Sequence, residues 1–254
     1  MEKQRILITG GAGYIGSILV PLLLKSNYLV TVIDNFMYKQ NTLLDIIGNP
    51  DFEIINQDVR RLDIIKKNIT KSDIIIPLAA IVGAPACDKN PHLTTEVNLE
   101  QAKNISKLIS KSQKIIFPVT NSGYGIGKKG IFCDENSPLN PISSYGKTKV
   151  EAEKIFLENG NAVTFRLATV FGSSPRMRMD LLVNDFVYRA YKDKFIVLFE
   201  SHFKRNFIHI KDVCLAFMHG IDNYSSMVGQ AYNVGLSNAN LSKLELCKEI
   251  KKQL

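Results

Sequence analysis

Short apolar runs alternate along the chain with segments of helical periodicity. The runs are rich in Ile and Val and mostly lack the polar alternation of a half-buried strand, which indicates strands covered on both faces. They are Ile6–Thr9, Leu29–Ile33, Glu53–Asn56, Asp73–Leu78, Lys114–Val119 and Ala162–Leu167. The helical segments are Tyr14–Lys25, Leu62–Ile69, Thr94–Ser110 and Ser144–Glu158. This order predicts an α/β fold with a doubly wound parallel sheet and helices on both faces.

The regular alternation of strands and helices ends after Gly172. From there we expect a smaller C-terminal region that is connected to the first sheet. Its predicted elements are helix Met179–Tyr191, strands Phe195–Phe199 and Asn206–Ile210, helix Lys211–Gly220, strand Ala231–Val234 and a helix over Leu241–Lys252 with Ser242 as N-cap. No low-complexity linker separates the two parts. We therefore expect one domain over residues 1–172 and a second region over residues 173–254.

The composition and the first residues predict neither a membrane protein nor a secreted one. The chain has 254 residues, of which 45% are hydrophobic and 22% charged, as in globular proteins. No apolar run approaches the roughly 20 residues of a membrane span. The first residues lack the basic and apolar segments of a secretory signal, so we expect a cytoplasmic protein.

The cysteine content and the net charge limit which metals, disulfides and binding partners we expect. Cys87, Cys133, Cys214 and Cys247 are scattered, without a CxxC pair or a histidine at ligand spacing, so we expect neither disulfides nor a metal site. The net charge of +8 suits an anionic ligand. No nucleic-acid-binding motif accompanies this charge, and nucleic acid is therefore not an expected partner.

A glycine-rich turn joins the first strand to the first helix. Gly10, Gly13 and Gly16 have a G-x-x-G-x-x-G spacing, which permits a tight turn and close approach of the backbone to a pyrophosphate at a helix N-terminus. Asp34 ends the second strand about 20 residues later, where a carboxylate accepts hydrogen bonds from ribose hydroxyls and repels a 2′-phosphate. The segment predicts a Rossmann-type dinucleotide site that prefers NAD to NADP.

A tyrosine and a lysine four residues apart on a helix can act together. The lysine lowers the pKa of the tyrosine, which then takes a proton from a substrate hydroxyl while hydride leaves the same carbon. Three pairs match: Tyr124/Lys128, Tyr145/Lys149 and Tyr188/Lys192. Glycines follow Tyr124, which indicates a loop, and Tyr188 lies beyond the predicted sheet. Tyr145 begins a helix after the fifth strand, at the edge where such sheets bind ligands, and is favoured.

Segments in one order along nearly the whole chain resemble the extended short-chain dehydrogenases/reductases, which comprise nucleotide-sugar epimerases and dehydratases. The matching segments are Gly10–Ser17, Asp34, Asp58-Val59, Leu78–Ala80, Thr120–Gly125, Tyr145–Lys149, Arg166–Gly172, Arg205–Asp212 and Tyr232–Gly235. The resemblance implies NAD as cofactor and a GDP- or UDP-linked sugar as substrate.

The resemblance also implies roles for single residues. The implied catalytic residues are Thr120, Tyr145 and Lys149. The implied NAD contacts are Gly10, Gly13, Tyr14, Ile15, Gly16, Asp34, Asn35, Asp58, Val59, Leu78, Ala79, Ala80, Tyr145 and Lys149, with Asp58 and Val59 at the adenine. The implied substrate contacts are Ser122, Thr169, Arg176, Asn184 and Arg205. An arginine fork suits phosphate oxygens.

One departure from the family and one narrower resemblance refine the expected reaction. Sugar 4,6-dehydratases carry Asp-Glu after the catalytic threonine, whereas this chain has Asn121-Ser122, so dehydration is not expected. Reversible oxidation at C4 remains, as half of an epimerisation or as a net dehydrogenation. Residues 174–186 resemble the GDP-manno-heptose 4-dehydrogenase branch, which serves bacterial surface polysaccharides.

The resemblance carries two expectations about assembly and completeness. Family members commonly dimerise through helices matching Thr94–Ser110 and Ser144–Glu158, so a homodimer is expected. They usually continue for some tens of residues beyond the point matching Leu254, so part of the sugar pocket is expected to be absent. A non-catalytic NAD-binding or regulatory protein is the alternative function, against which the intact Thr120, Tyr145 and Lys149 argue.

Overall fold

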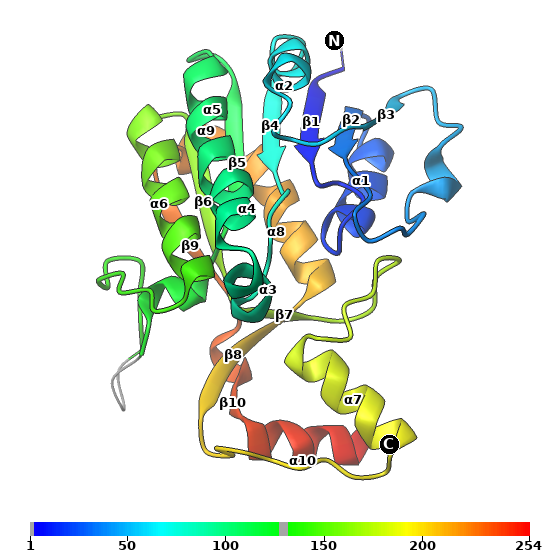
Figure 1. The fold of residues 1–254 in the computed structure, drawn as a ribbon, viewed down its shortest axis with the longest axis vertical. Helices are drawn as coiled ribbons and strands as arrows, with labels where there is room; N and C mark the ends of the chain where they lie inside the picture. Colours follow the sequence, from blue (N-terminus) through cyan, green and yellow to red (C-terminus); the bar gives the residue numbers. More distant parts are fainter. Residues whose placement is uncertain (1–2, 127–131) are drawn as a thin grey trace.

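A seven-stranded, all-parallel sheet forms the centre of the molecule (Figure 1). The computed structural model describes residues 3–126 and 132–254. The strands are β1 (Arg5–Thr9), β2 (Leu29–Asp34), β3 (Phe52–Asn56), β4 (Ile74–Pro77), β5 (Lys114–Thr120), β6 (Ala162–Leu167) and β9 (Ala231–Val234). They lie in the order β3-β2-β1-β4-β5-β6-β9, which confirms the predicted doubly wound fold.

Helices cover both faces of this sheet. α1 (Gly16–Lys25) and α8 (Ile210–Asp222) pack on one face, and α2 (Leu62–Ile69), α5 (Gln101–Leu108) and α6 (Ser144–Asn159) pack on the other. Successive side chains of a strand point to opposite faces. Ile6 and Ile8 therefore join the first core, whereas Leu7 joins the second. Both cores exclude water, which explains why the strands read as continuous apolar runs.

Short helical segments connect these elements. The helix predicted over Thr94–Ser110 is the end of α4 (Pro91–Thr95), a π-helical turn (Glu96–Glu100) and α5 in succession. The other short segments are α3 (Ala84–Lys89), α9 (Tyr224–Met227) and the 3₁₀ turns Leu44–Ile46, Asn121–Tyr124 and Ser237–Ala239.

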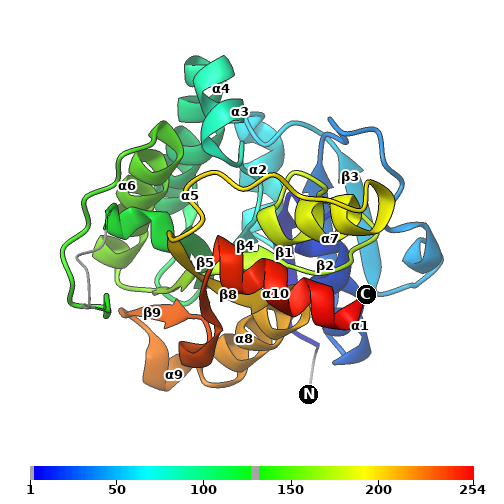
Figure 2. The same ribbon diagram turned by 90° about the horizontal axis from the view of Figure 1, so that it is seen from below.

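A smaller unit lies below the carboxyl ends of the strands (Figures 1 and 2). It contains β7 (Thr169–Phe171), β8 (Lys204–His209), β10 (Asn240–Ser242), α7 (Leu182–Lys192) and α10 (Lys243–Gln253), with strand order β10-β8-β7. Its core is formed by Val183, Phe186, Phe207, Leu246 and Ile250. Ser242 caps α10 as predicted, in a capping box with Glu245.

The chain returns to the large sheet after building most of the smaller unit. α8 packs across one face of the large sheet, and β9 pairs with β6 as its last strand. Residues 210–234 thus lie on the large sheet, although the boundary after residue 172 assigned them to the second region.

The strand predicted over Phe195–Phe199 is wrong. Residues 195–198 have no regular secondary structure, residue 199 lies in a bend, and no described strand pairs with the segment. Ile196 and Leu198 pack against the core of the smaller unit, whereas Phe195, Val197 and Phe199 are exposed. The alternation that suggested a strand reflects this one-sided packing. The helix predicted from Met179 begins later, at Leu182, and the short strands β7 and β10 were not predicted.

Candidate active site

A cleft of about 1010 Å³ lies at the carboxyl ends of the strands, between the large sheet and the smaller unit. The strand order reverses between β1 and β4, and doubly wound sheets bind ligands at this point. The cleft is lined by every residue predicted to contact NAD and by the predicted catalytic residues Thr120, Tyr145 and Lys149. The predicted substrate contacts Ser122, Thr169, Arg176 and Arg205 line it too.

The glycine-rich turn leaves a cradle that larger side chains would fill. Gly10 has a φ of +71°, and a Cβ atom there would lie 2.6 Å from the backbone of Ala79. A Cβ atom on Gly16 would lie 2.3 Å from the carbonyl oxygen of Gly11. Both approaches are too close for any residue but glycine. The turn can therefore lie against Ala79 and α1 while its backbone faces the cleft, as a pyrophosphate requires.

Asp34 at the end of β2 connects this turn to the next loop. Its carboxylate accepts hydrogen bonds from the backbone N–H groups of Ala12 (3.0 Å) and Phe36 (2.9 Å). Burial raises the pKa of Asp34 above its ordinary value, and the two N–H groups act in the opposite direction. The side chain also lines the cleft, in the position that ribose recognition needs.

Thr120, Tyr145 and Lys149 approach the cleft from adjacent elements. Thr120 ends β5, and its hydroxyl donates to Ser122 Oγ (3.1 Å) and accepts from the N–H of Ser122 (3.1 Å). Ser143 caps α6 by accepting from the N–H of Gly146 (3.1 Å), so Tyr145 lies in the first turn of the helix. Lys149 follows one turn later on the same side.

Burial changes the protonation of the tyrosine and lysine in opposite directions. It raises the pKa of Tyr145 to about 12, although the positive charge of Arg178 acts in the other direction. It lowers the pKa of Lys149 to about 7, although the negative charge of Glu153 opposes this. The ammonium group of Lys149 lies 3.8 Å from the centre of the Phe117 ring. In both cases desolvation disfavours the charged form, which is the phenolate of Tyr145 and the ammonium of Lys149.

A buried ion pair supports this side of the cleft. Glu153, one turn after Lys149, accepts hydrogen bonds from Arg166 Nε (3.0 Å) and from the hydroxyl of Thr164 (2.8 Å). Arg166 Nη1 donates to the hydroxyl of Tyr124 (3.0 Å), which donates to Asn233 Oδ1 (2.7 Å). Tyr124, the last residue of the 3₁₀ turn Asn121–Tyr124, thus belongs to a structural hydrogen-bond network.

The two competing Tyr-x-x-x-Lys pairs differ from Tyr145/Lys149. Tyr124 has its hydroxyl engaged as described, and Lys128 lies outside the described residues. Tyr188 and Lys192 lie on the outer side of α7, where the tyrosine is exposed and the ammonium group lies 5.3 Å from the centre of its ring.

Asn184 does not line the cleft, contrary to the expectation from the resemblance. Its side-chain oxygen accepts from the N–H of Gly172 (3.0 Å), and its amide donates to the carbonyl oxygen of Arg178 (2.9 Å) and to Tyr14 Oη (3.3 Å). With both ends of its amide engaged inside the chain, Asn184 fixes the segment between β7 and α7 and has no group left for a diphosphate.

Three arginines contribute to the cleft from loops. The guanidinium of Arg176 stacks 3.8 Å above the ring of Tyr38, and Arg178 is paired with Asp180. Arg60 and Arg178 also line the cleft, and the sequence analysis assigned neither of them to the site. Arg178 could have been found from its position two residues after Arg176, which was assigned to the site.

Within residues 3–126 and 132–254, no three or more His, Cys, Asp or Glu side chains form a group that could hold a metal ion. No helix in the same part combines the length and apolar character needed to span a membrane.

Comparison with known proteins identifies the family. The family model described as "NAD dependent epimerase/dehydratase family" matches residues 6–235. A putative UDP-glucose 4-epimerase of Methanocaldococcus jannaschii is 30% identical over 222 residues, which cover 83% of this chain and 71% of that protein. The predicted family and its cofactor are confirmed by this match.

Solved structures agree with the fold. The UDP-glucuronic acid 4-epimerase of Bacillus cereus, in complex with UDP-glucuronic acid and NAD, is 27% identical with a TM-score of 0.87, covering 98% of this chain and 82% of that one. The dTDP-glucose 4,6-dehydratase of Bacillus anthracis, in complex with NAD, is 24% identical with a TM-score of 0.84, covering 98% of this chain and 80% of that one, and shows the same fold. This chain belongs to the NAD-dependent epimerase/dehydratase family.

Proposed function

We propose that this chain reversibly oxidises the C4 hydroxyl of a nucleotide-linked sugar. The observation that carries the proposal is that one cleft is lined both by the glycine-rich turn with Asp34 and by Thr120, Tyr145 and Lys149. A cofactor held by the first group would lie beside the second. The chemistry that NAD supplies when bound is acceptance of a hydride.

The residues that would hold NAD follow from their places in the cleft. The turn at Gly10–Gly16 would receive the pyrophosphate, Asp34 the adenosine ribose, and Asp58 with Val59 the adenine. Lys149, beside the catalytic tyrosine, would hold the nicotinamide ribose through its ammonium group.

Tyr145 would take the proton of the C4 hydroxyl while hydride leaves C4. With a pKa of about 12, the phenol is protonated at neutral pH. Its deprotonated form therefore depends on nearby positive charge: Arg178 already acts to lower the pKa of Tyr145, and Lys149 in its protonated form would add a second cation in the same cleft. Thr120 would donate or accept a hydrogen bond at the reacting oxygen, because its hydroxyl already exchanges hydrogen bonds with Ser122 at the end of β5.

The residues after Thr120 support oxidation without dehydration. Asn121 and Ser122 line the cleft, and neither side chain is an acid able to protonate a leaving hydroxyl group at C6. The product of C4 oxidation would then be reduced again on the opposite face, giving an epimer, or released.

We propose UDP or GDP as the nucleotide, held through its diphosphate by Arg205 and Arg176. The similarity to two proteins named as UDP-sugar 4-epimerases supports epimerisation of a UDP-sugar. The motif at residues 174–186 instead supports GDP-manno-heptose dehydrogenation for a surface polysaccharide. We propose a homodimer formed through residues 94–110, which include α5, and residues 144–158 of α6. Light scattering should then give twice the mass of the chain.

The test is turnover of UDP-glucose, UDP-glucuronic acid and GDP-manno-heptose, followed by nicotinamide absorbance and by separation of epimers. Tyr145→Phe should lose turnover at least 1,000-fold, roughly the size of general-base and positioning effects combined, and still bind NAD. Tyr188→Phe removes the hydroxyl of an exposed Tyr-x-x-x-Lys pair and should change nothing. Full activity in Tyr145→Phe would refute the assigned base. A wild-type protein that binds NAD and converts none of these sugars would support the non-catalytic alternative.

A further inference from the structure

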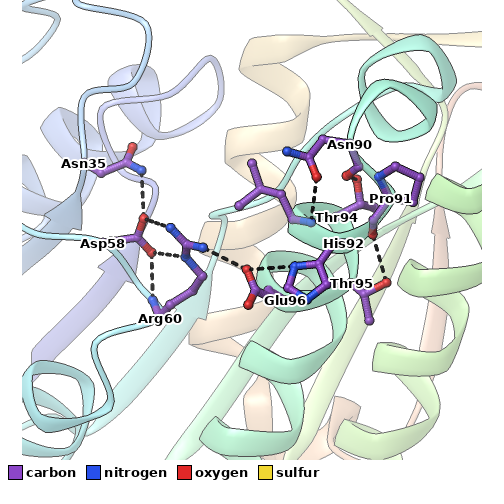
Figure 3. Close-up of polar contacts among 10 residues, drawn as sticks. Asn35, Asp58, Arg60, Asn90, Pro91, His92, Thr94, Thr95 and Glu96 are labelled. Carbon is purple, nitrogen blue, oxygen red and sulfur yellow. Dashed lines mark hydrogen bonds and ion pairs between the residues drawn. The ribbon is translucent and has the colours of Figure 1, made fainter.

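A charged network beside the cleft connects the loop that follows β3 with the helical turn that follows α4 (Figure 3). Asp58 and Arg60 lie in the loop between β3 and α2, and Glu96 begins the π-helical turn after α4. Arg60 Nη1 donates to Glu96 Oε2 at 2.8 Å. No sequence pattern indicates this contact, since its partners are 36 residues apart and both are residue types common on protein surfaces.

Arg60 fixes the carboxylate of Asp58 at three points. Its N–H and Nε both donate to Oδ1 at 2.9 Å, and Nη2 donates to Oδ2 at 3.0 Å. A fourth and longer contact, 3.3 Å, comes from the side-chain amide of Asn35 to Oδ2. The Arg60 hydrogen bonds hold the pKa of Asp58 below its ordinary value, although burial opposes them. Asp58 is therefore a fixed acceptor that cannot donate.

Apolar side chains line the cleft next to this network. They are Val59, which follows Asp58 in the loop, and Leu93 and Val97, which lie in α4 and in the π-helical turn. Val59 and Val97 are buried. A planar base bound here would meet these apolar side chains and, at its polar edge, the Asp58 carboxylate. The weakest of the four contacts, from Asn35, is the one that an incoming amino group can most easily replace.

We propose that Arg60 is a positioning residue for purine selection. Arg60 holds the Asp58 carboxylate in place as an acceptor for the 6-amino group of adenine. Glu96, from the helical turn after α4, holds the guanidinium of Arg60 in turn. This inference rests on the assignment of the cleft to NAD and refines it. An acceptor that cannot donate repels the carbonyl oxygen that hypoxanthine carries at the same position. Arg60 would act through Asp58 and need not touch the base.

The experiment compares binding of NAD and of nicotinamide hypoxanthine dinucleotide by calorimetry, in the absence of any sugar nucleotide. The two dinucleotides differ at the purine alone. In Arg60→Met the ratio of their affinities should fall about tenfold, as expected when the acceptor loses its charged partner. A residue needed only for folding would weaken both dinucleotides equally and leave the ratio unchanged.

Arg61→Met is the matched control. Arg61 is the next residue, and it pairs in the same way with a carboxylate two positions along, Asp63, through Nε (3.1 Å) and Nη2 (2.9 Å). It does not line the cleft. Arg61→Met should keep the wild-type ratio. Arg60→Lys should restore the ratio only in part, because an ammonium group cannot bind both carboxylate oxygens as a fork.

Glu96→Gln tests the anchor without removing Arg60. The ratio should fall about threefold, since a neutral amide holds the guanidinium less firmly. Glu100→Gln, which breaks an exposed pair with Lys103, should leave it unchanged. An unchanged ratio in both Arg60→Met and Glu96→Gln, or an unchanged ratio in Glu96→Gln should Arg60→Met not fold, overturns the proposal. Loss of sugar turnover bears only on the proposed reaction, whereas failure of the wild type to bind either dinucleotide overturns both.

Discussion

The hydroxyl group of Tyr14 donates a hydrogen bond of 2.6 Å to the carbonyl oxygen of Gly172. This contact ties the glycine-rich turn to the first residues beyond β7, across 158 positions of sequence. Ser174 strengthens the connection by donating to the carbonyl oxygen of Tyr14 (2.8 Å), and Asn184 donates to the Tyr14 hydroxyl (3.3 Å). The two sides of the cleft are therefore joined at the turn itself.

Tyr14→Phe should loosen this connection. It leaves the carbonyl oxygen of Gly172 and the amide of Asn184 short of a partner, which costs about 1–3 kcal/mol. We expect the KM for the sugar nucleotide to rise at least threefold with a smaller change in NAD affinity, because the smaller unit loses its fixed place. Tyr224→Phe removes a bond of the same 2.6 Å length, to Asn161, away from the cleft and should affect stability alone. Equal kinetic effects in both variants would contradict this role.

Gly16→Ala should abolish NAD binding. Its Cβ atom would lie 2.3 Å from the carbonyl oxygen of Gly11, so the turn and α1 would have to separate. At Gly48 nothing lies within 4 Å of an added Cβ atom, and Gly48→Ala should bind NAD normally. Calorimetric titration with NAD checks both variants. Normal affinity in Gly16→Ala would mean that the turn adjusts without cost.

Lys149 should make the stability of the ligand-free protein depend on pH. Its pKa falls from 10.5 to about 7 on folding, so between these values the unfolded chain binds more protons than the folded one. Between pH 7 and 10.5 the free energy of unfolding therefore increases as the pH rises. This group contributes at most about 1.4 kcal/mol per pH unit. Lys149→Met should remove this contribution between pH 8 and 10, a window set by the shift itself.

Urea unfolding at several pH values in this window measures the effect. Lys147→Met, at an exposed position of the same helix, is the control and should keep the wild-type slope. Identical slopes in Lys149→Met and wild type would show that the buried lysine keeps its ordinary pKa.

The buried pair of Arg166 and Glu153 should show strong coupling. Arg166→Met leaves the Glu153 carboxylate, 2% exposed, without its cation, which costs about 3–5 kcal/mol. The double variant Arg166→Met/Glu153→Leu removes both charges and should recover most of this loss. Urea unfolding of the two single variants and the double variant gives the coupling free energy. Additive losses would indicate that the two side chains act independently.

The nucleotide-binding part of the fold could be predicted because its signals are local. Strands covered on both faces are read from unbroken apolar runs such as Ile74–Pro77, and Gly16 is required by a contact only five residues away. The choice of Tyr145 among three tyrosines followed from its place after the fifth strand. All predicted NAD contacts line the cleft for the same reason, since strand ends meet at one edge of a parallel sheet.

The smaller unit was harder because its structure depends on distant partners. Whether Phe195–Phe199 forms a strand depends on a neighbour that the segment does not have. Asn184 was assigned to substrate, but its amide is used to hold Gly172 and Arg178. The Arg60–Glu96 contact is likewise made by the folded chain, and no local pattern reports it.

The return of the chain to β9 means that the cofactor-binding half is not an autonomous folding unit. A fragment ending at residue 172 would lack β9 and leave β6, whose residues are all buried, as an unprotected edge able to pair with other molecules. It would also lose α8, whose Val213, Cys214 and Phe217 are fully buried on the sheet. Dissection of this protein at its apparent boundary would thus yield an aggregating fragment. Exchange of the smaller unit between relatives requires at least three junctions in the chain, before β7, after β8 and before β10.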